Sequence, residues 1–590
     1  MASAIQDYGF VGDGETGALI SRGGSVDFLC WPRFDSDACF CALLGDAEHG
    51  CWRIAPEAQP NGIRRRYRGD TLVLETTFDT PSGTVRVLDF MPLGVSHSSL
   101  VRIVEGVCGE VPMRLELRLR FAYGLMPPWS RCNSDCFVAD VGPDLVALHS
   151  PTPIDCHGPD ASSRFTVQAG QRLAFQLSYG SSSRAPPERT DAEAALEATV
   201  AFWEDWIGRF RKPCLWPAAV RRSLIVLKAL LHRGTGGVVA AATLGLPEIP
   251  GGGLNWDYRY CWLRDATFAL TALLNAGYKD EARGWRDWIL RAVAGRPEKL
   301  QVVYRLDGGR HLSEWQVQWL PGYEGSQPVR VGNEAAAQRQ LDVYGELLDS
   351  MHVAASGGIE RIERGIQVEA ALVEHLESIW EQPCSDLWES RGEPQCYTYS
   401  QAMAWVGITQ FLKGARTHQA ASADMIRRLE DLRSRIHETV CRRGYDESRG
   451  HFVDYYGGAE LDAALLLLPL VNFLPVDDPR MAATISAVER ELMDGGLVRR
   501  KRAKHDGHGE GAFLVCSCWL ADCMAKQGRH EEARRMLERV IGLSNDVGLL
   551  SEEFHVPSGR LIGNIPQALT HLGVVNTALR LSGPVLERGA

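Results

Sequence analysis

The feature that most constrains the fold of this chain is a helical repeat of apolar residues that runs from about residue 218 almost to the end. We count twelve such segments, and they alternate in character along the chain. The segments at 460–474 and 511–528 are apolar nearly all round, whereas those at 421–442 and 530–543 carry a single apolar stripe. A helix that is apolar on every side must be enclosed by others. The alternation therefore predicts six inner and six outer helices, the arrangement of an (α/α)6 barrel.

The amino-terminal part of the chain has a different period. Apolar and polar residues alternate at 84–90, 114–123 and 172–179, as in strands with one face on a core. Turn residues separate these runs, so we expect an antiparallel β-sandwich over residues 1–185. A stretch rich in Ser and Pro follows at 180–190. We expect a linker helix over 186–217 and a catalytic domain over 218–590, which makes the chain a multidomain β + α protein.

Charge and hydropathy exclude several classes of partner. The formal net charge is −11, and Lys and Arg form no basic stripe, which disfavours nucleic acid. The longest apolar run, at 461–474, is too short to cross a bilayer, and the first residues do not resemble a leader, so we expect a cytoplasmic protein without a membrane partner. The sixteen cysteines form no CxxC pair, which favours buried free thiols. The oligomeric state stays open.

The loops before the inner helices carry most of the chemically informative residues. If each outer helix leads into the next inner one, these loops gather at one end of the barrel. They include "GGGLNWDYRYCWLRDA", "GYEGSQPVRVGNEA", "DLWESRGEPQCYTYS" and "LLSEEFHVPSGRLIGNIPQ". Aromatic rings pack on the C–H faces of a pyranose, and Arg, Asp and Glu bind its hydroxyls. The sequence therefore predicts a binding site for a small saccharide at this end.

Hydrolysis of a glycosidic bond needs two carboxyl groups, one protonated and one ionised. The loops offer Glu389, next to Trp388, and the pair Glu552 and Glu553. An apolar flank is expected to hold Glu389 protonated. Simpler roles stay open for each candidate: a helix cap or solvated charge for Glu389, an ion pair of Asp265 with Arg264, surface carboxylates for Glu552 and Glu553, and core packing for Trp256, Trp262 and Trp388.

A metal site is a further alternative. His505 and His508 stand near Glu510, but this HxxH flanked by glycines lacks the usual spacing of metal ligands. We expect neither a metal nor an organic cofactor.

At these residues the sequence resembles glycoside hydrolase family 15, the glucoamylase-like family that also contains glucodextranases and bacterial trehalases. The resemblance rests on "NWDYRYCWLRDA", "PVRVGNEAAAQRQLDVYGE", "DLWESRG", "LDAALLLLPLVNFLP", "EGAFLVCSCWLAD", "NDVGLLSEEF" and "GNIPQALTHLGVVNTAL", and on the opening "DYGFVGDGETGALISRGGSVDFLCWPRFDSDACF". It covers nearly the whole chain. It implies a β-sandwich before an (α/α)6 barrel, and inversion at an α-glucosidic carbon with release of β-glucose from a non-reducing end.

The resemblance also implies roles for single residues. Glu389 in "LWE" matches the general acid, and Glu552, the first Glu of "SEEF", matches the general base. Arg264 and Asp265 in "WLRD" match the pair that binds hydroxyls of the terminal glucose. The expected saccharide site is completed by Trp256, Trp262, Arg330 and Trp388. The family usually has an aspartate after the "SEEF" element, and His555 in its place puts the hydrogen bonding of the base in doubt.

Several functions remain open at this point. Within the resembling family, trehalose is favoured by a cytoplasmic chain without a starch-binding appendage, and a glucoamylase-type α-1,4/α-1,6-glucosidase is the alternative. A disaccharide phosphorylase, in which phosphate replaces water, belongs to another class, and the matched base argues against it. A non-catalytic glycan-binding protein is the third alternative.

Overall fold

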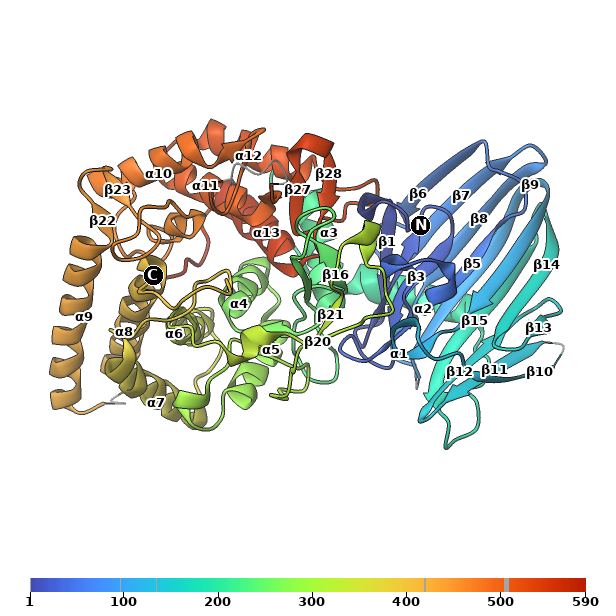
Figure 1. The fold of residues 1–590 in the computed structure, drawn as a ribbon, viewed down its shortest axis with the longest axis horizontal. Coiled ribbons are helices and arrows are strands. Elements are labelled where there is room, and N and C mark those ends of the chain that lie inside the picture. The colour runs from blue at the N-terminus through green and yellow to red at the C-terminus, as the bar shows by residue number, and fades with distance from the viewer. Residues whose placement is uncertain (1, 96, 134, 419–420, 503–508, 590) are drawn as a thin grey trace.

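The computed structural model describes residues 2–95, 97–133, 135–418, 421–502 and 509–589. Figure 1 shows two parts side by side, a domain of long strands from the amino-terminal third of the chain and a domain of helices from the rest. The helical part contains the predicted alternation of inner and outer helices, and the strands pair antiparallel. The fold class predicted from the two sequence periods is confirmed.

Fifteen strands form the amino-terminal domain. The longest is β9 (Ser99–Arg118). Its first half pairs with β8 (Gly83–Phe90) and β15 (Arg172–Ser181), and its second half with β5 (Cys51–Pro56) and β14 (Asp160–Gln168). One strand thus belongs to both sheets of the sandwich. The other strands are β1 (Tyr8–Gly12), β2 (Gly17–Ser21), β3 (Ser25–Cys30), β4 (Ala38–Phe40), β6 (Gly62–Tyr67), β7 (Leu74–Thr80), β10 (Trp129–Cys132), β11 (Cys136–Val141), β12 (Asp144–His149) and β13 (Asp155–His157).

The helical domain follows α2 (Ala192–Gly208), which lies between the two parts along the chain. Its outer helices are α3 (Pro217–Leu230), α5 (Lys279–Ala292), α7 (Glu363–Ile379), α9 (Ala423–Arg443), α10 (Pro479–Glu491) and α12 (His530–Ile541). Its inner helices are α4 (Arg264–Ala276), α6 (Asp342–Ser356), α8 (Thr398–His418), α11 (Leu514–Lys526) and α13 (Ala568–Ser582). Every residue of α11 from Leu514 to Met524 is buried, whereas α12 buries one stripe, as the apolar pattern predicts.

One predicted helix is wrong. The run at 460–474 forms only a five-residue 3-10 helix, η7 (Ala463–Leu467), followed by turns, although nearly all of it is buried. Pro469 stands in the middle of the run, and proline lacks the N–H that a helix needs and disfavours a helical residue before it. Asn472 then takes a left-handed backbone, with φ of +56°. The segment is still the fourth of the six inner elements along the chain, and it contacts the inner helices α8 and α11.

Short strands lie in the connections between the helices of the helical domain. They are β16 (Leu244–Pro247), β17 (Asn255–Asp257), β18 (Cys261–Trp262), β19 (Val303–Tyr304), β20 (Trp315–Gln316), β21 (Arg330–Val331), β22 (Tyr445–Asp446), β23 (His451–Phe452), β24 (Met493–Asp494), β25 (Leu497–Val498), β26 (Ala512–Phe513), β27 (Glu553–His555) and β28 (Arg560–Ile562). In Figure 1, β16, β20 and β21 lie at the side of the helical domain that faces the β-domain.

Arg259 joins the two domains. Its side chain is fully buried, and it pairs with Asp257 at 2.7 Å. It also donates hydrogen bonds to the Ser36 carbonyl at 2.6 Å and to the Tyr123 hydroxyl at 3.0 Å, both in the β-domain. The β-domain therefore fixes the segment 255–262, which leads directly into α4.

Two further sequence expectations concern the cysteines and the absence of a membrane-spanning helix. Cys132 and Cys156 form a disulfide between β10 and β13, so the expectation of free thiols is wrong for this pair, neither of which is buried. The other fourteen cysteines are free. Across the described ranges, no helix combines the length and the apolar character that crossing a membrane requires.

Candidate active site

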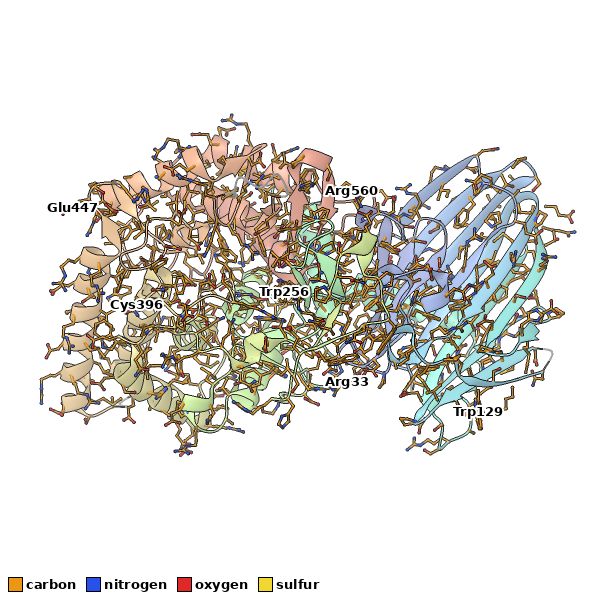
Figure 2. All side chains as sticks on the ribbon, viewed as in Figure 1. Arg33, Trp129, Trp256, Cys396, Glu447 and Arg560 are labelled. Carbon is orange, nitrogen blue, oxygen red and sulfur yellow. A yellow bond between two sulfur atoms is a disulfide. The ribbon has the colours of Figure 1, made fainter. Side chains whose placement is uncertain are left out.

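The loops before the inner helices surround a cavity of about 530 Å³. Its volume falls in the range of small-molecule sites. Residues from three of the four quoted loops line it, among them Trp256, Tyr258, Asn333, Trp388 and Glu389, and Glu248 and Arg500 join them from outside these loops. Figure 2 places Trp256 on the side of the helical domain toward the β-domain. The prediction that these loops converge is confirmed for this group.

Glu389 is held in a strained loop at the cavity wall. Its backbone is left-handed, with φ of +60°, a conformation that costs a residue with a side chain about 1–3 kcal/mol. The Asp386 carbonyl accepts a hydrogen bond from Glu389 N at 3.1 Å, and the Asp386 carboxylate accepts one from Ser390 N at 2.7 Å. Gln338 Nε2 donates to the Glu389 carbonyl at 3.0 Å. Such over-determined strain is typical of functional residues.

Two donors from the start of α4 fix the Glu389 carboxylate. Trp262 Nε1 donates to Glu389 Oε1 at 2.7 Å, and Arg264 Nη1 donates to the same oxygen at 3.0 Å. Burial raises the pKa of Glu389 above its ordinary value, while the charge of Arg264 and the hydrogen bond from Trp262 oppose the rise. A carboxylic acid kept partly protonated beside a cavity can act as a general acid.

Arg264 and Asp265, predicted to bind hydroxyls of the terminal glucose, form an ion pair with each other. Arg264 Nε donates to Asp265 Oδ1 at 3.1 Å, and its Nη1 also donates to the Leu387 carbonyl at 2.6 Å. The guanidinium therefore ties the start of α4 to the loop of Glu389. Arg264 and Asp265 do not themselves line the cavity but lie directly behind Glu389.

Glu552 lies on a different wall. It precedes β27 in the three-stranded sheet β26–β27–β28, and its side chain is completely buried. Gln567 Nε2 donates to Glu552 Oε1 at 3.4 Å. Burial, and then the charge of Glu248, raise the pKa of Glu552 well above its ordinary value, and the facing hydroxyl of Tyr258 lowers it. The described residues that line the cavity include Glu248 and Tyr258 but not Glu552.

Tyr258 links the two carboxyl groups. The charges of Glu552, Glu248 and Glu389, after burial, raise the pKa of its phenol well above the usual value. Its ring also meets that of Trp262 edge to face, with centroids 5.3 Å apart. Tyr258 thus lines the cavity together with Glu389 and feels the charges of both candidate carboxyl groups.

A cluster of carboxylates surrounds one guanidinium beside Glu552. Arg500 Nη2 pairs with Glu248 Oε2 at 2.5 Å, and Arg500 also forms an ion pair with Glu510. Glu248, Glu510 and Glu553 each place one oxygen within 4.8 Å of the others, a spacing that a cation could occupy. The guanidinium of Arg500 supplies a positive charge to this group. His505 and His508, considered above as metal ligands, lie outside the described residues.

The predicted aromatic residues take different places. Trp388 lines the cavity, and its indole N–H is fixed by Asp462 at 2.9 and 3.0 Å. Trp256 also lines the cavity, with the guanidinium carbons of Arg330 and Arg391 each 4.6 Å from its ring. Arg330 donates to the Gly253 carbonyl at 2.7 Å, so it supports the loop of Trp256. Trp262 is buried, and its indole N–H donates a hydrogen bond to Glu389.

His555 is turned away from the base candidate. Its Nδ1 lies 2.7 Å from Ser558 Oγ, and the charges that act on it are those of Arg499, Arg560 and Asp494. The groups that shift the pKa of Glu552 come instead from Glu248, Tyr258 and Arg500.

Sequence reasoning missed Glu248, Tyr258 and Arg500. Tyr258 stood inside the quoted "NWDYRYCW" motif, and its place between two aromatic neighbours could have suggested it. Arg500 lies in the basic run "RRKR", whose members look alike in sequence. Glu248 follows "LGLP" and carries no local signal; only its ion pair with a residue 252 positions away marks it.

Comparisons with known proteins agree with this geometry. A family model described as glycosyl hydrolases family 15 matches residues 218–579, and a model described as trehalase-like, N-terminal, matches residues 1–203. A trehalase of Mycobacterium tuberculosis is 35% identical, with 98% of this chain and 89% of the relative covered. A trehalase of Mycolicibacterium smegmatis is also 35% identical, with 98% and 91% covered.

A solved structure shares the fold of the whole chain. A bacterial glucoamylase complexed with acarbose matches with a TM-score of 0.75 and 13% identity, and the match covers 99% of this chain and 95% of that one. At this identity the likeness shows the fold, a β-domain followed by a helical barrel.

Proposed function

Because this chain belongs to the glycosyl hydrolases of family 15, we propose that it is a trehalase, an inverting hydrolase that splits α,α-trehalose into two glucose molecules. The chain is a glycoside hydrolase. The choice of trehalose is supported by the curated relatives that bear the name trehalase and align over nearly the whole chain. The single observation that carries the mechanism is the Glu389 carboxylate at the cavity wall, held by hydrogen bonds from Trp262 and Arg264.

In the proposed mechanism, glucose is bound at the inner end of the cavity beside Arg264 and Asp265. Glu389 gives its proton to the leaving glycosidic oxygen, and Glu552 takes a proton from the water that attacks the opposite face of the sugar. Trp262 and Arg264 support the negative charge that Glu389 acquires. Trp256 and Trp388 offer ring surfaces to the sugar at the cavity wall.

The test is a substrate panel with product stereochemistry. The purified protein is incubated with trehalose, maltose, isomaltose and a longer maltooligosaccharide, and NMR records the glucose anomer released first. We expect trehalose to be the best substrate and to give α- and β-glucose in equal amounts, because inversion changes only the attacked ring. Release of α-glucose alone would reject inversion. Faster cleavage of maltose or isomaltose would favour the glucoamylase-type alternative, and a requirement for phosphate would favour a phosphorylase.

Single substitutions test the two carboxyl groups. Glu389→Gln and Glu552→Gln should each lower kcat on trehalose by about 10²-fold or more, in line with general acid and base catalysis. Glu393→Gln is the matched control, since Glu393 is exposed in the same loop as Glu389, and it should keep nearly full activity. A Glu552→Gln variant with wild-type kcat would remove Glu552 from the role of base. The cytoplasmic location stays a prediction, which cell fractionation would check.

A further inference from the structure

The complete burial of Glu552 creates a requirement that the proposed mechanism leaves open. A base that takes a proton from water in each cycle must lose that proton before the next one. The side chain of Glu552 is 0% exposed, and the cavity is lined by its neighbours instead. A second acidic group beside Glu552 would give the proton a route to the water of the cavity.

Glu248 lies in the right place to be that group. Gly563 packs on Glu552 so closely that a Cβ there would lie 2.7 Å from Glu552 Oε2. The amide of the same glycine donates to the carbonyl of Pro247 at 2.8 Å, and Pro247 directly precedes Glu248. The end of β16 is therefore fixed beside the carboxyl group of Glu552, while the Glu248 side chain lines the cavity.

Free oxygen atoms remain on both carboxyl groups. Within the part of the chain that the structure describes, Glu248 Oε1 and Glu552 Oε2 are buried and have no hydrogen-bond partner. Leaving a buried carboxylate oxygen unpaired is costly, and a proton on one of the two groups reduces that cost. Two neighbouring carboxyl groups that share a proton are a familiar solution to this problem.

The charged groups around Glu248 also favour a proton on one of these carboxyl groups. Arg500 pairs with it, and Glu510, Glu552 and Glu553 face it as like charges, with the Tyr258 phenol at the edge of the group. One guanidinium cannot balance the three buried carboxylates Glu248, Glu552 and Glu553 together with the half-buried Glu510, which favours a proton on one of the buried groups. Burial, with the like charge of Glu510, raises the pKa of Glu248 to about 7, against the opposing charge of Arg500.

We propose that Glu248 is the proton partner of Glu552: it holds a proton while Glu552 is ionised, and it passes the proton that Glu552 takes from water to the solvent in the cavity. The inference rests on the base role proposed for Glu552.

The cycle balances without any other reactant. The two carboxyl groups share one proton, and attack occurs from the state in which Glu248 holds that proton and Glu552 is ionised. Attack leaves both protonated; Glu248 then releases its proton to water in the cavity. Next, the O–H bond of Glu552 breaks as an O–H bond forms on Glu248, which restores the starting state. One proton leaves per cycle, and Glu389 takes one up, as the net reaction requires.

Glu248→Gln separates this role from a structural one. Glutamine has the shape of a protonated glutamate, so Glu552 stays able to accept a proton, but the amide cannot pass it on. In quenched-flow measurements of glucose with saturating trehalose, we expect a burst of about one turnover at nearly the wild-type rate. The steady-state kcat should then be about 10²-fold below that of the wild type. Loss of sugar binding or of folding would instead lower the burst rate or raise KM.

Three further variants make the outcome decisive. Glu510→Gln removes the other partner of Arg500 and should give no burst, whatever its effect on KM. Glu248→Asp should restore much of the steady-state rate, and added formate should raise it in Glu248→Ala but not in Glu248→Gln. A Glu248→Gln variant with wild-type steady-state kcat, or with burst and steady state lowered equally, overturns the inference. Failure of the proposed function looks different: the wild type would not cleave trehalose, or Glu552→Gln would remain active.

Discussion

At the scale of single residues, the state of the general-acid candidate depends on one indole N–H. Trp262 Nε1 donates to Glu389 Oε1 at 2.7 Å, and this bond favours the ionised carboxylate, which lowers the pKa of Glu389. Trp262→Phe should therefore raise that pKa. The alkaline limb of the kcat/KM profile, where the acid loses its proton, is expected to move to higher pH. Initial rates on trehalose across the pH range measure the shift.

Trp288→Phe is the matched control for this prediction. Trp288 Nε1 donates to the Leu306 carbonyl at 2.7 Å, and this buried indole does not line the cavity. Both variants lose one buried hydrogen bond, at a cost to stability of about 1–3 kcal/mol. Only Trp262→Phe should move the alkaline limb, and an equal movement in both variants would mean that the indole of Trp262 has no specific effect on Glu389.

The sequence predicts those site residues whose roles are suggested by a single local motif. Arg264 and Asp265 are adjacent in sequence, and the loop of Glu389 meets them directly in the structure. Glu248 and Arg500 become recognisable only through their ion pair, because an isolated Glu and one Arg in a basic run have no distinctive spacing. Long-range contacts of this kind carry no local pattern, which is why they were missed.

At the scale of elements, the hairpin of β27 and β28 controls the position of the base candidate. Gly563 has a left-handed backbone, with φ of +74°, and a Cβ there would lie 2.7 Å from both Cβ and Oε2 of Glu552. Gly563→Ala should therefore push the Glu552 side chain aside. We expect kcat on trehalose to fall by about 10²-fold or more, the scale of a lost general base. Steady-state kinetics with a thermal unfolding curve provide the measurement.

Gly559→Ala controls for backbone strain in the same hairpin. Gly559 also has a left-handed backbone, with φ of +64°, but a Cβ there would meet nothing within 4 Å. Both substitutions carry the strain of a left-handed alanine, about 1–2 kcal/mol. Activity should survive in Gly559→Ala, and an equal loss of activity in the two variants would show that strain, and not the contact with Glu552, decides the result.

The segment at 460–474 shows where element prediction fails. Its apolar residues are buried as expected, so the hydrophobic pattern correctly placed it inside the barrel. Pro469 and the left-handed Asn472 then decide the local backbone, which is a 3-10 turn instead of an α-helix. Burial follows from composition, whereas helix type also depends on a single residue that removes an N–H.

At the scale of the whole molecule, the two periods of the sequence predict two domains but not how they meet. The sequence does not predict that Arg259 joins the two domains, because Arg259 lies in a motif that the sequence analysis places in the saccharide site. In the structure its guanidinium bonds the β-domain through Ser36 and Tyr123, while Tyr258, the preceding residue, faces the cavity. The segment that joins the domains is thus the segment that builds the site.

The segment 585–589 contacts the inner helices α4 and α6, and the stability of this part of the barrel should depend on one buried arginine. Arg588 pairs with Glu346 and, at 3.4 Å, with Asp349, both on α6 with fully buried side chains. Its guanidinium also lies 4.2 Å from the Phe268 ring on α4. Removing one partner leaves buried charges uncompensated, which costs about 3–5 kcal/mol. Arg588→Met should therefore lower the free energy of unfolding of the helical domain by that amount in urea titrations.

Charge-matched variants decide whether Arg588 stabilises the helical domain mainly through its ion pairs or through its packing. Arg588→Met combined with Glu346→Gln should recover part of the loss, because one orphaned charge is removed together with its partner. Arg534→Met breaks an exposed pair with Glu531 at 2.9 Å and should cost no more than about 1 kcal/mol. If Arg588→Met destabilises the protein no more than Arg534→Met, the buried ion pairs of Arg588 contribute no more to the free energy of unfolding than an exposed pair does. If the double variant recovers nothing, the loss comes from the contact with Phe268 and not from Glu346.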